Sequence, residues 1–318
     1  MKYYFIINPN AGKGTYTETL EENIHKICEK REITYEIYHT TEVFDATVFV
    51  KKVLADENNL PARFYACGGD GTLGEVVCGA VGVRGASVGV IPIGTGNDFV
   101  RNFSSGELFF DIDAQIDGEE ERIDLLKCND RYAVNMVNIG FDCEVVKKKE
   151  VLNRKSFIPS ELAYVGGVVM TLAKKPGVSA RISCDGGEVV QKNCLLTTFA
   201  NGAFCGGGFH SNPEATLDDG VIDALFVENI SRRRFVSLVG SYKKGTHLVP
   251  KNEKILENKK IKQVEFKFDS TQSASIDGEI VDFDQLCIEV VPSAIDFVVP
   301  LGVARNRARK EEAEKVAL

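Results

Sequence analysis

The sequence has no apolar run long enough to cross a bilayer. Its longest nearly apolar stretch, at 162–173, falls well short of the ~20 residues that a spanning helix needs. The apolar part of the N-terminal stretch MKYYFIINPNAG is also too short for a signal peptide. We therefore expect a cytoplasmic protein, at most peripheral to the inner surface of a membrane.

Cysteine occurs without the spacing that metal sites and disulfide frameworks use. The nine cysteines are scattered and odd in number, and none form a C-x-x-C pair. Several lie within apolar runs, where cysteine behaves as a small buried hydrophobe. The pattern indicates a reducing compartment and argues against a zinc site.

The sequence also lacks an excess of positive charge, since 38 Lys and Arg face 46 Asp and Glu and the formal net charge is −8. A chain of this charge is unlike one that presents a broad face to nucleic acid, so we expect no nucleic-acid partner. Basic residues cluster only locally, at 147–149, 232–234, 243–244 and 305–310. Such runs are usually solvated surface; the sharper interpretation is peripheral contact with an anionic membrane surface. The sequence is compatible with a homodimer but does not determine the oligomeric state.

Two patterns divide the 318 residues, a length that suits about two domains. In the first third, buried strands are predicted at 2–8, 33–39, 63–68 and 87–94, with helices between them. Leu20, Ile24, Ile27 and Cys28 mark one face of the first helix. From about Ile123, strand patterns follow one another through turns, with one helix predicted at 159–175. This order favours an α/β domain with a parallel sheet, followed by a β-rich domain.

Three glycine-rich turns punctuate the first domain: NPNAGKG, GGDGTLG and IPIGTGNDF. Turns that follow parallel strands converge outside the carboxyl ends of the strands, where backbone N–H groups can hold an anion. Neither named phosphate motif fits. NAGKGT lacks the first glycine of a P-loop, and the segment 76–97 has no acidic residue to hold the ribose of a dinucleotide.

Asp70 lies in the middle of the second turn, where its charge would repel a phosphate unless a metal intervenes. Mg²⁺ in phosphate sites uses one or two carboxylates together with phosphate oxygens. Asp70 is therefore a candidate magnesium ligand, directly or through water, and Asp98 and Asp124 could share the task. We expect Asp70 to lie in an exposed loop.

These segments resemble the diacylglycerol-kinase catalytic family. In the first domain the resemblance rests on GGDGTLGEVV, IPIGTGNDF and NPNAGKG. It continues along nearly the whole chain in FANGAFCGGGF, NPEATLDDGVIDALFV and IDGEIV. GGDGT alone is shared with NAD kinases, whereas PIGTGNDF and the later DGE separate the lipid kinases. Bacterial lipid kinases of the DgkB and YegS type are the nearest relatives, with sphingosine and ceramide kinases further off.

The resemblance implies an ATP- and magnesium-dependent lipid kinase. Its fold would be an α/β nucleotide-binding domain with a Rossmann-like parallel sheet at 1–124, joined by the tail at 301–318. A β-sandwich domain at 125–300 would take the lipid substrate, diacylglycerol or a related lipid. Phosphatidylglycerol, a sphingoid base and an isoprenoid alcohol remain open as acceptors.

The resemblance also assigns site residues by position. Glu279 would be the general base and Asp70 its partner in catalysis. A structural magnesium would be held by backbone oxygens of Thr216 and Val221 and by the carboxylate of Asp219. The acidic network on the nucleotide magnesium would be Asp70, Asp98 and Asp124. The nucleotide contacts would be Asn8, Pro9, Asn10, Ala11, Gly12, Thr40, Gly68, Gly69, Asp70, Gly71, Thr72, Leu73, Gly74 and Thr95.

One position departs from the family, and two other functions stay open. The family usually has asparagine where this chain has Gly74, so any side-chain contact from that position is lost. An NAD-kinase-like phosphotransferase acting on a soluble substrate is one alternative, and a catalytically silent nucleotide-binding regulator is the other. All the expected acids are present, which argues against the regulator. By local sequence alone, Glu279 beside an Asp-Gly turn would be an ordinary hairpin residue. The resemblance instead favours Glu279 as the general base.

Overall fold

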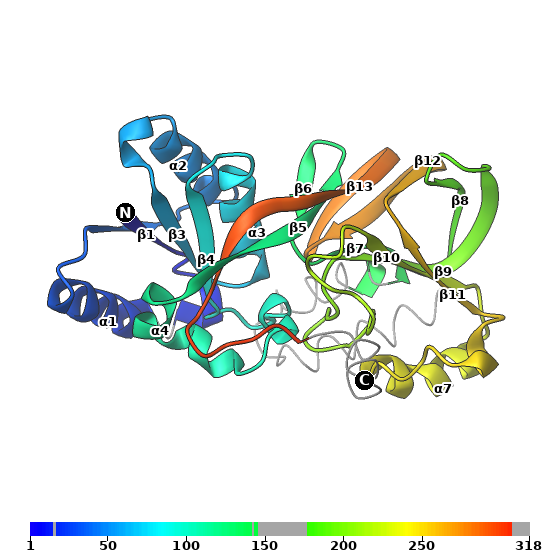
Figure 1. Ribbon diagram of the computed structural model, residues 1–318. Helices are drawn as coiled ribbons and strands as arrows, with labels where there is room; N and C mark the ends of the chain where they lie inside the picture. Colours follow the sequence, from blue (N-terminus) through cyan, green and yellow to red (C-terminus); the bar gives the residue numbers. More distant parts are fainter. Residues whose placement is uncertain (15–16, 142, 146–176, 307–318) are drawn as a thin grey trace, which may run out of the picture.

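The computed structural model describes residues 1–14, 17–141, 143–145 and 177–306 (Figure 1). Its first part alternates strands and helices, as the sequence predicts. The strands are β1 (Lys2–Ile7), β2 (Tyr35–His39), β3 (Ala62–Cys67) and β4 (Ala86–Ile91). The helices are α1 (Thr17–Lys30), α2 (Asp45–Leu54), α3 (Asp70–Ala80) and α4 (Ile112–Ile116), and short 3-10 helices are η1 (Ala11–Gly14), η2 (Glu57–Asn59), η3 (Phe99–Asn102) and η4 (Gly106–Phe110).

Strands β2, β1, β3 and β4 pair in parallel in this spatial order. Helices α2 and α3 cover one face, where Val50 and Val76 join the same apolar cluster. Helices α1 and α4 cover the other face through Ile24 and Ile112. Every residue of β3 and β4 is buried because helices shield both faces of these strands. The predicted face of α1 is confirmed: Leu20, Ile24 and Cys28 are buried, and Ile27 is partly buried against the same cluster.

The second part is built mainly of antiparallel strands. They are β5 (Glu119–Cys128), β6 (Arg131–Ala133), β7 (Met136–Gly140), β8 (Val178–Cys184), β9 (Val190–Ala200), β10 (Ile222–Glu228), β11 (Leu256–Ile261), β12 (Gln263–Ile276) and β13 (Glu279–Val299). The strands in the described part of the chain belong to one sheet whose pairings are mostly antiparallel. Parallel pairing is found among β1–β4 and between β13 and β4, so the comparison with a Rossmann fold stays a prediction.

The prediction of a single helix in the second part was wrong. An additional helix, α7 (Arg232–Lys243), follows β10 and leads to η5 (Pro250–Asn252). Its apolar residues Phe235, Leu238, Val239 and Tyr242 do fall at helical spacing and line one cavity, although none of them is fully buried. The pattern was therefore present in the sequence, and the prediction overlooked it. The helix predicted at 159–175 lies outside the described residues, as does most of the C-terminal tail. Among the helices that the model describes, none is both long and apolar enough to cross a membrane.

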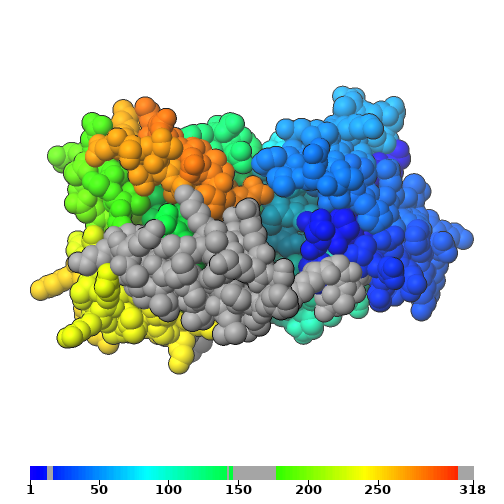
Figure 2. Space-filling view, turned by 180° about the vertical axis from the view of Figure 1, so that it is seen from behind, coloured from blue at the N-terminus to red at the C-terminus, as the bar shows by residue number. Residues whose placement is uncertain are grey.

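Strand β13 connects the two parts of the molecule. Near its beginning it pairs with β12, further along with β5, and Asp296 and Phe297 pair in parallel with β4. After it, the backbone carbonyl of Ala304 accepts a hydrogen bond from Ser104 N at 2.7 Å. Figure 2 shows the parts as two lobes, with the orange β12–β13 region reaching the blue N-terminal lobe.

Candidate active site

The glycine-rich turns after β1, β3 and β4 meet at one edge of the parallel strands. Gly94 N donates to the carbonyl of Gly68 at 3.1 Å, and Asn8 Nδ2 donates to Thr72 Oγ1 at 3.3 Å. A Cβ atom on Gly94 would lie 2.4 Å from the Cα of Gly69. Only glycine therefore allows the second and third turns to touch here.

The predicted nucleotide residues lie on or beside these turns. Thr40 follows β2, is buried, and donates its N–H to the carbonyl of Ile7 at 2.9 Å. Thr95 is exposed in the turn after β4. The turn after β1 is formed by Asn8, Pro9, Asn10, Ala11 and Gly12. The turn after β3 and the first turns of α3 are formed by Gly68, Gly69, Asp70, Gly71, Thr72, Leu73 and Gly74. The fold brings these residues together, and their contact with a nucleotide stays a prediction.

Asp70 is the first residue of α3 and is half-buried, not part of an exposed loop as the sequence suggested. Its Oδ2 accepts a hydrogen bond from Asp98 N at 3.1 Å, and its Oδ1 accepts one from Phe99 N at 3.0 Å. The carboxylate thus fixes the third turn against the second. Because each carboxylate oxygen has two lone pairs, one on each oxygen is still available to a cation.

Asp98 carries this connection on to the second part of the chain. Its side chain is buried, and its two oxygens accept hydrogen bonds from Gly207 N at 2.8 Å and Gly208 N at 2.7 Å. Burial and the nearby charge of Asp70 raise the pKa of Asp98, and the two backbone donors oppose that rise. The Asp98 and Asp70 carboxylates lie near each other: a Cβ on Gly96 would lie 3.1 Å from Asp70 Oδ2 and 3.9 Å from Asp98 Oδ2.

Asp124 occupies a different place from Asp70 and Asp98. It is buried on β5, and its oxygens accept hydrogen bonds from Gly220 N and Ser293 N, both at 2.7 Å. Burial raises its pKa, and the acidic side chains that add to the rise are Asp219 and Asp218. Asp124 therefore lies beside the 217–221 loop, and a magnesium network shared with Asp70 and Asp98 stays a prediction.

The residues predicted to hold a structural magnesium lie at the 217–221 loop, and their role as ligands stays a prediction. The Asp219 carboxylate is already matched by a protein cation, because Lys260 Nζ lies 2.7 Å from its Oδ2. The same ammonium lies 3.2 Å from Oδ2 of the buried Asp223. In the described part of the chain, no three His, Cys, Asp or Glu side chains are grouped as metal ligands would be. The predicted site would use the backbone oxygens of Thr216 and Val221 together with one carboxylate, and Lys260 brings a positive charge to the same loop.

Glu279 reaches the first turn of α3 from the β12–β13 hairpin. Asp277 and Gly278 form the turn with positive φ angles of 46° and 95°, the conformation that an Asp-Gly pair favours. The Asp277 carboxylate accepts hydrogen bonds from the backbone N–H groups of Val134, Asn135 and Met136 at 2.6 to 3.0 Å. This anchor holds Glu279 so near α3 that a Cβ on Gly71 would lie 3.9 Å from Glu279 Oε1.

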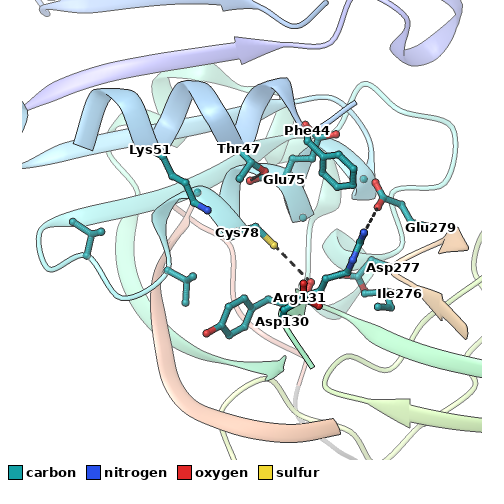
Figure 3. A pocket seen from close by; sticks show the side chains of 16 residues that line it. Phe44, Thr47, Lys51, Glu75, Cys78, Asp130, Arg131, Ile276, Asp277 and Glu279 are labelled. Carbon is teal, nitrogen blue, oxygen red and sulfur yellow. Dashed lines mark hydrogen bonds and ion pairs between the residues drawn. The ribbon is translucent and has the colours of Figure 1, made fainter. Parts of the chain in front are cut away.

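A cavity of about 640 Å³ opens beside Glu279, between α2 and α3 on one side and β6 and the hairpin turn on the other (Figure 3). Lys51, Glu75, Arg131 and Phe44 line it. Gly74 faces it, and a Cβ there would meet nothing within 4 Å, so the missing asparagine leaves open space. Burial, followed by the charge of Glu75, raises the pKa of Glu279, and Arg131 opposes the rise.

Two residues of this site escaped sequence reasoning. Asp277 was read only as a turn residue, although the DGE motif contains it. Arg131 had no local signal, because the carboxylate that it faces lies far along the chain.

Comparison with known proteins matches both parts of the chain. Residues 2–128 match the family model of the diacylglycerol kinase catalytic domain, and residues 135–299 match that of the YegS C-terminal NAD kinase beta sandwich-like domain. The diacylglycerol kinase of Staphylococcus carnosus is 30% identical over 276 residues, which are 86% of this chain and 87% of that protein. That of Staphylococcus saprophyticus is 31% identical with the same coverage.

The fold is also known from a crystal structure. A diacylglycerol kinase from Bacillus anthracis superposes with a TM-score of 0.67 at 21% identity, over 95% of this chain and 98% of that one. The likeness supports a β-sandwich-like second domain.

Proposed function

Because the chain belongs to the diacylglycerol kinase catalytic family, of the DgkB and YegS type, and is a lipid kinase, we propose that it transfers the γ-phosphate of ATP to the hydroxyl of diacylglycerol. The observation that carries this proposal is the position of Glu279. Its carboxylate lies across from the N-terminal turn of α3, where the predicted nucleotide turns converge, and beside a cavity that can receive an acceptor.

We infer that residues 1–124, with the tail from 301, act as a Rossmann-like nucleotide-binding unit, and that residues 125–300 receive the lipid. The turns after β1, β3 and β4 would hold the phosphates through backbone N–H groups, helped by the positive end of α3. The contacts of the described tail support this division, since Asn306 N donates to the carbonyl of Asn102 at 2.8 Å.

The carboxylates of Asp70 and Asp98 suit a magnesium ion bound with the nucleotide. They are hard oxygen donors near each other, and Mg²⁺ in phosphate sites takes one or two carboxylates together with phosphate oxygens. When bound, the ion would offset negative charge on the phosphates. The chain's own contribution is the Asp70 and Asp98 framework, which holds the second turn, the third turn and residues 207–208 in one arrangement.

In this mechanism Glu279 accepts the proton of the lipid hydroxyl. The hydroxyl oxygen then bonds to the γ-phosphorus, the bond from that phosphorus to the bridging oxygen breaks, and ADP leaves. A general base works best when its pKa lies near the operating pH. Burial and Glu75 raise the pKa of Glu279 above its ordinary value, which strengthens it as a base.

Replacing Glu279 by glutamine tests the proposal, because the change keeps size and polarity but removes basicity. We expect lipid phosphorylation to fall on the order of 10²–10⁴-fold, with ATP affinity and melting temperature close to wild type. The matched control is Glu289→Gln on the same strand, an exposed partner of Lys127 that should keep full activity. Labelled ATP with a panel of lipids and with NAD would measure turnover. A stable Glu279→Gln enzyme with wild-type turnover would remove the residue from the mechanism, and phosphorylation of NAD but of no lipid would overturn the substrate.

A further inference from the structure

We propose that Arg131, held by the ring of Phe44, is a positioning residue that orients the Glu279 carboxylate for proton transfer. This inference rests on the proposed role of Glu279 as the base. Arg131 belongs to β6, Phe44 precedes α2, and Glu279 begins β13, so the three residues link both sides of the cavity (Figure 3).

The spacing between Arg131 and Glu279 suits orientation better than neutralisation. Arg131 Nη1 lies 3.9 Å from Glu279 Oε2, at the limit of an ion pair and beyond hydrogen-bond distance. Both side chains are about one-third exposed. A bidentate pair at 2.8 Å would hold the carboxylate tightly and make it a weak base. At 3.9 Å the guanidinium attracts the carboxylate while its oxygens remain open to a hydroxyl proton.

Phe44 fixes the guanidinium from the opposite side of the cavity. The guanidinium carbon of Arg131 lies 5.3 Å from the centre of the Phe44 ring, within the range of a cation–π contact. Phe44 adopts φ 67°, a left-handed conformation that is costly for a bulky residue. Strain of this kind persists where surrounding structure holds it, and it is frequent at functional sites. Here it presents an exposed aromatic ring to Arg131, which among the described residues is the one cation at ion-pair distance from Glu279.

The remaining charged groups around Glu279 set the direction of the expected pH effect. Glu75 from α3 raises the pKa of Glu279, and Arg131 from β6 lowers it. The other titratable side chains that line the cavity are those of Lys51 from α2, Cys78 from α3, Asp130 and Tyr132 beside and within β6, and Asp277, whose oxygens face residues 134–136. Loss of Arg131 therefore raises the pKa of Glu279, and the base becomes protonated at a higher pH.

The test is the pH profile of kcat/KM for Arg131→Gln, Arg131→Lys and Phe44→Leu. In Arg131→Gln, we expect the acidic limb to move to higher pH, because the positive charge that lowers the pKa of Glu279 is lost. Arg131→Lys keeps the charge and should keep the limb at its wild-type position with a lower rate. Phe44→Leu should shift the limb in the same direction as Arg131→Gln, but less. Arg122→Gln, an exposed arginine paired with Asp296 away from the cavity, is the control.

Three readouts separate the outcomes. An unmoved acidic limb in Arg131→Gln, with a raised KM for ATP or lipid, would show that Arg131 binds substrate directly and would overturn the inference. If Arg131→Gln fails to fold, the inference is tested by the acidic limbs of the pH profiles of Arg131→Lys and Phe44→Leu. An unmoved acidic limb in Phe44→Leu would overturn the role of the Phe44 ring. These outcomes differ from the one that would show that Glu279 is not the base. In that case the Glu279→Gln enzyme would turn over like wild type, independently of the results for the Arg131 variants.

Discussion

Asp70 has a structural role in addition to the metal-ligand role that the sequence predicts. Its position in a phosphate-binding turn suggests a metal ligand, and its hydrogen bonds show a structural role as well. The two tasks are compatible because backbone donors and a cation use different lone pairs of the same oxygens. A substitution at Asp70 is therefore expected to affect both rate and stability.

We predict that Asp70→Asn lowers turnover on the order of 10²–10³-fold, the loss that follows removal of one preorganised charged group. The melting temperature should fall too. An amide has one acceptor oxygen, so its NH₂ group would face Asp98 N or Phe99 N and leave that donor unsatisfied, at about 1–3 kcal/mol. Turnover and thermal unfolding measured on the same sample test this.

The control for Asp70 is Asp113→Asn, which removes a carboxylate that is half-exposed and paired with Arg31. It should leave turnover unchanged. A stable Asp70→Asn enzyme that works at the wild-type rate would contradict both roles of Asp70.

At the scale of elements, the 217–221 loop is held to its surroundings by the chain's own cations. Lys260 on β11 contacts Asp219 and Asp223, and Arg305 Nη1 lies 2.7 Å from Asp218 Oδ2. Burial raises the pKa of Asp223 to about 6, and Lys260 opposes that rise. The ammonium thus brings positive charge to the loop where the family resemblance places a second magnesium.

We predict that removing metal does not loosen this loop. Without nucleotide, the wild-type melting temperature should be the same in EDTA as in magnesium. Lys260→Met should lower stability by about 1–3 kcal/mol, because it leaves the buried Asp223 without its partner while Lys260 itself is partly exposed.

Magnesium should restore part of the stability of Lys260→Met, since the freed carboxylates can then hold a cation. Lys262→Met, an exposed lysine two residues further along the chain, is the control and should melt like wild type. A wild-type protein that melts at a lower temperature in EDTA would show instead that the loop holds a resident ion.

At the scale of the whole molecule, surface charge bears on how a lipid substrate is reached. The net charge of −8 opposes approach to an anionic bilayer, so local basic clusters would have to mediate contact. Among the described residues, α7 carries such a cluster: Arg233 and Lys244 are exposed at its two ends, with the exposed Val236 between them. The cluster predicted at 147–149 lies outside the described residues.

We predict that the protein binds anionic vesicles and that binding weakens as salt rises, because exposed charges are screened beyond about 8 Å at physiological ionic strength. The double substitution Arg233→Gln with Lys244→Gln should weaken binding further, whereas Lys26→Gln with Lys30→Gln on α1 removes equal charge elsewhere and should change it less. Vesicle co-sedimentation measures this. Equal binding to neutral and anionic vesicles at all salt concentrations would exclude docking by the basic clusters.

The sequence by itself determined the elements of the first part and the positions of its turns. The periodic spacing of apolar residues places α1, α2 and β1–β4 because burial on one or both faces has a fixed period in each kind of element. The glycines of the three turns could also be recognised, since close backbone approach excludes side chains. The DGE motif selected Glu279 through resemblance, because no local property distinguishes it from an ordinary hairpin residue.

Only the tertiary structure decided which partners these residues meet. Asp124 accepts hydrogen bonds from Gly220 and Ser293, Lys260 forms an ion pair with Asp219, and Arg131 faces Glu279. Each contact joins residues that lie far apart in the chain and belong to different elements. A periodic pattern records whether a side chain is buried or exposed but carries no information on its partner. The choice of partner, and with it the difference between a metal ligand and a hydrogen-bonded anchor, depends on how β13 brings the two parts of the chain together.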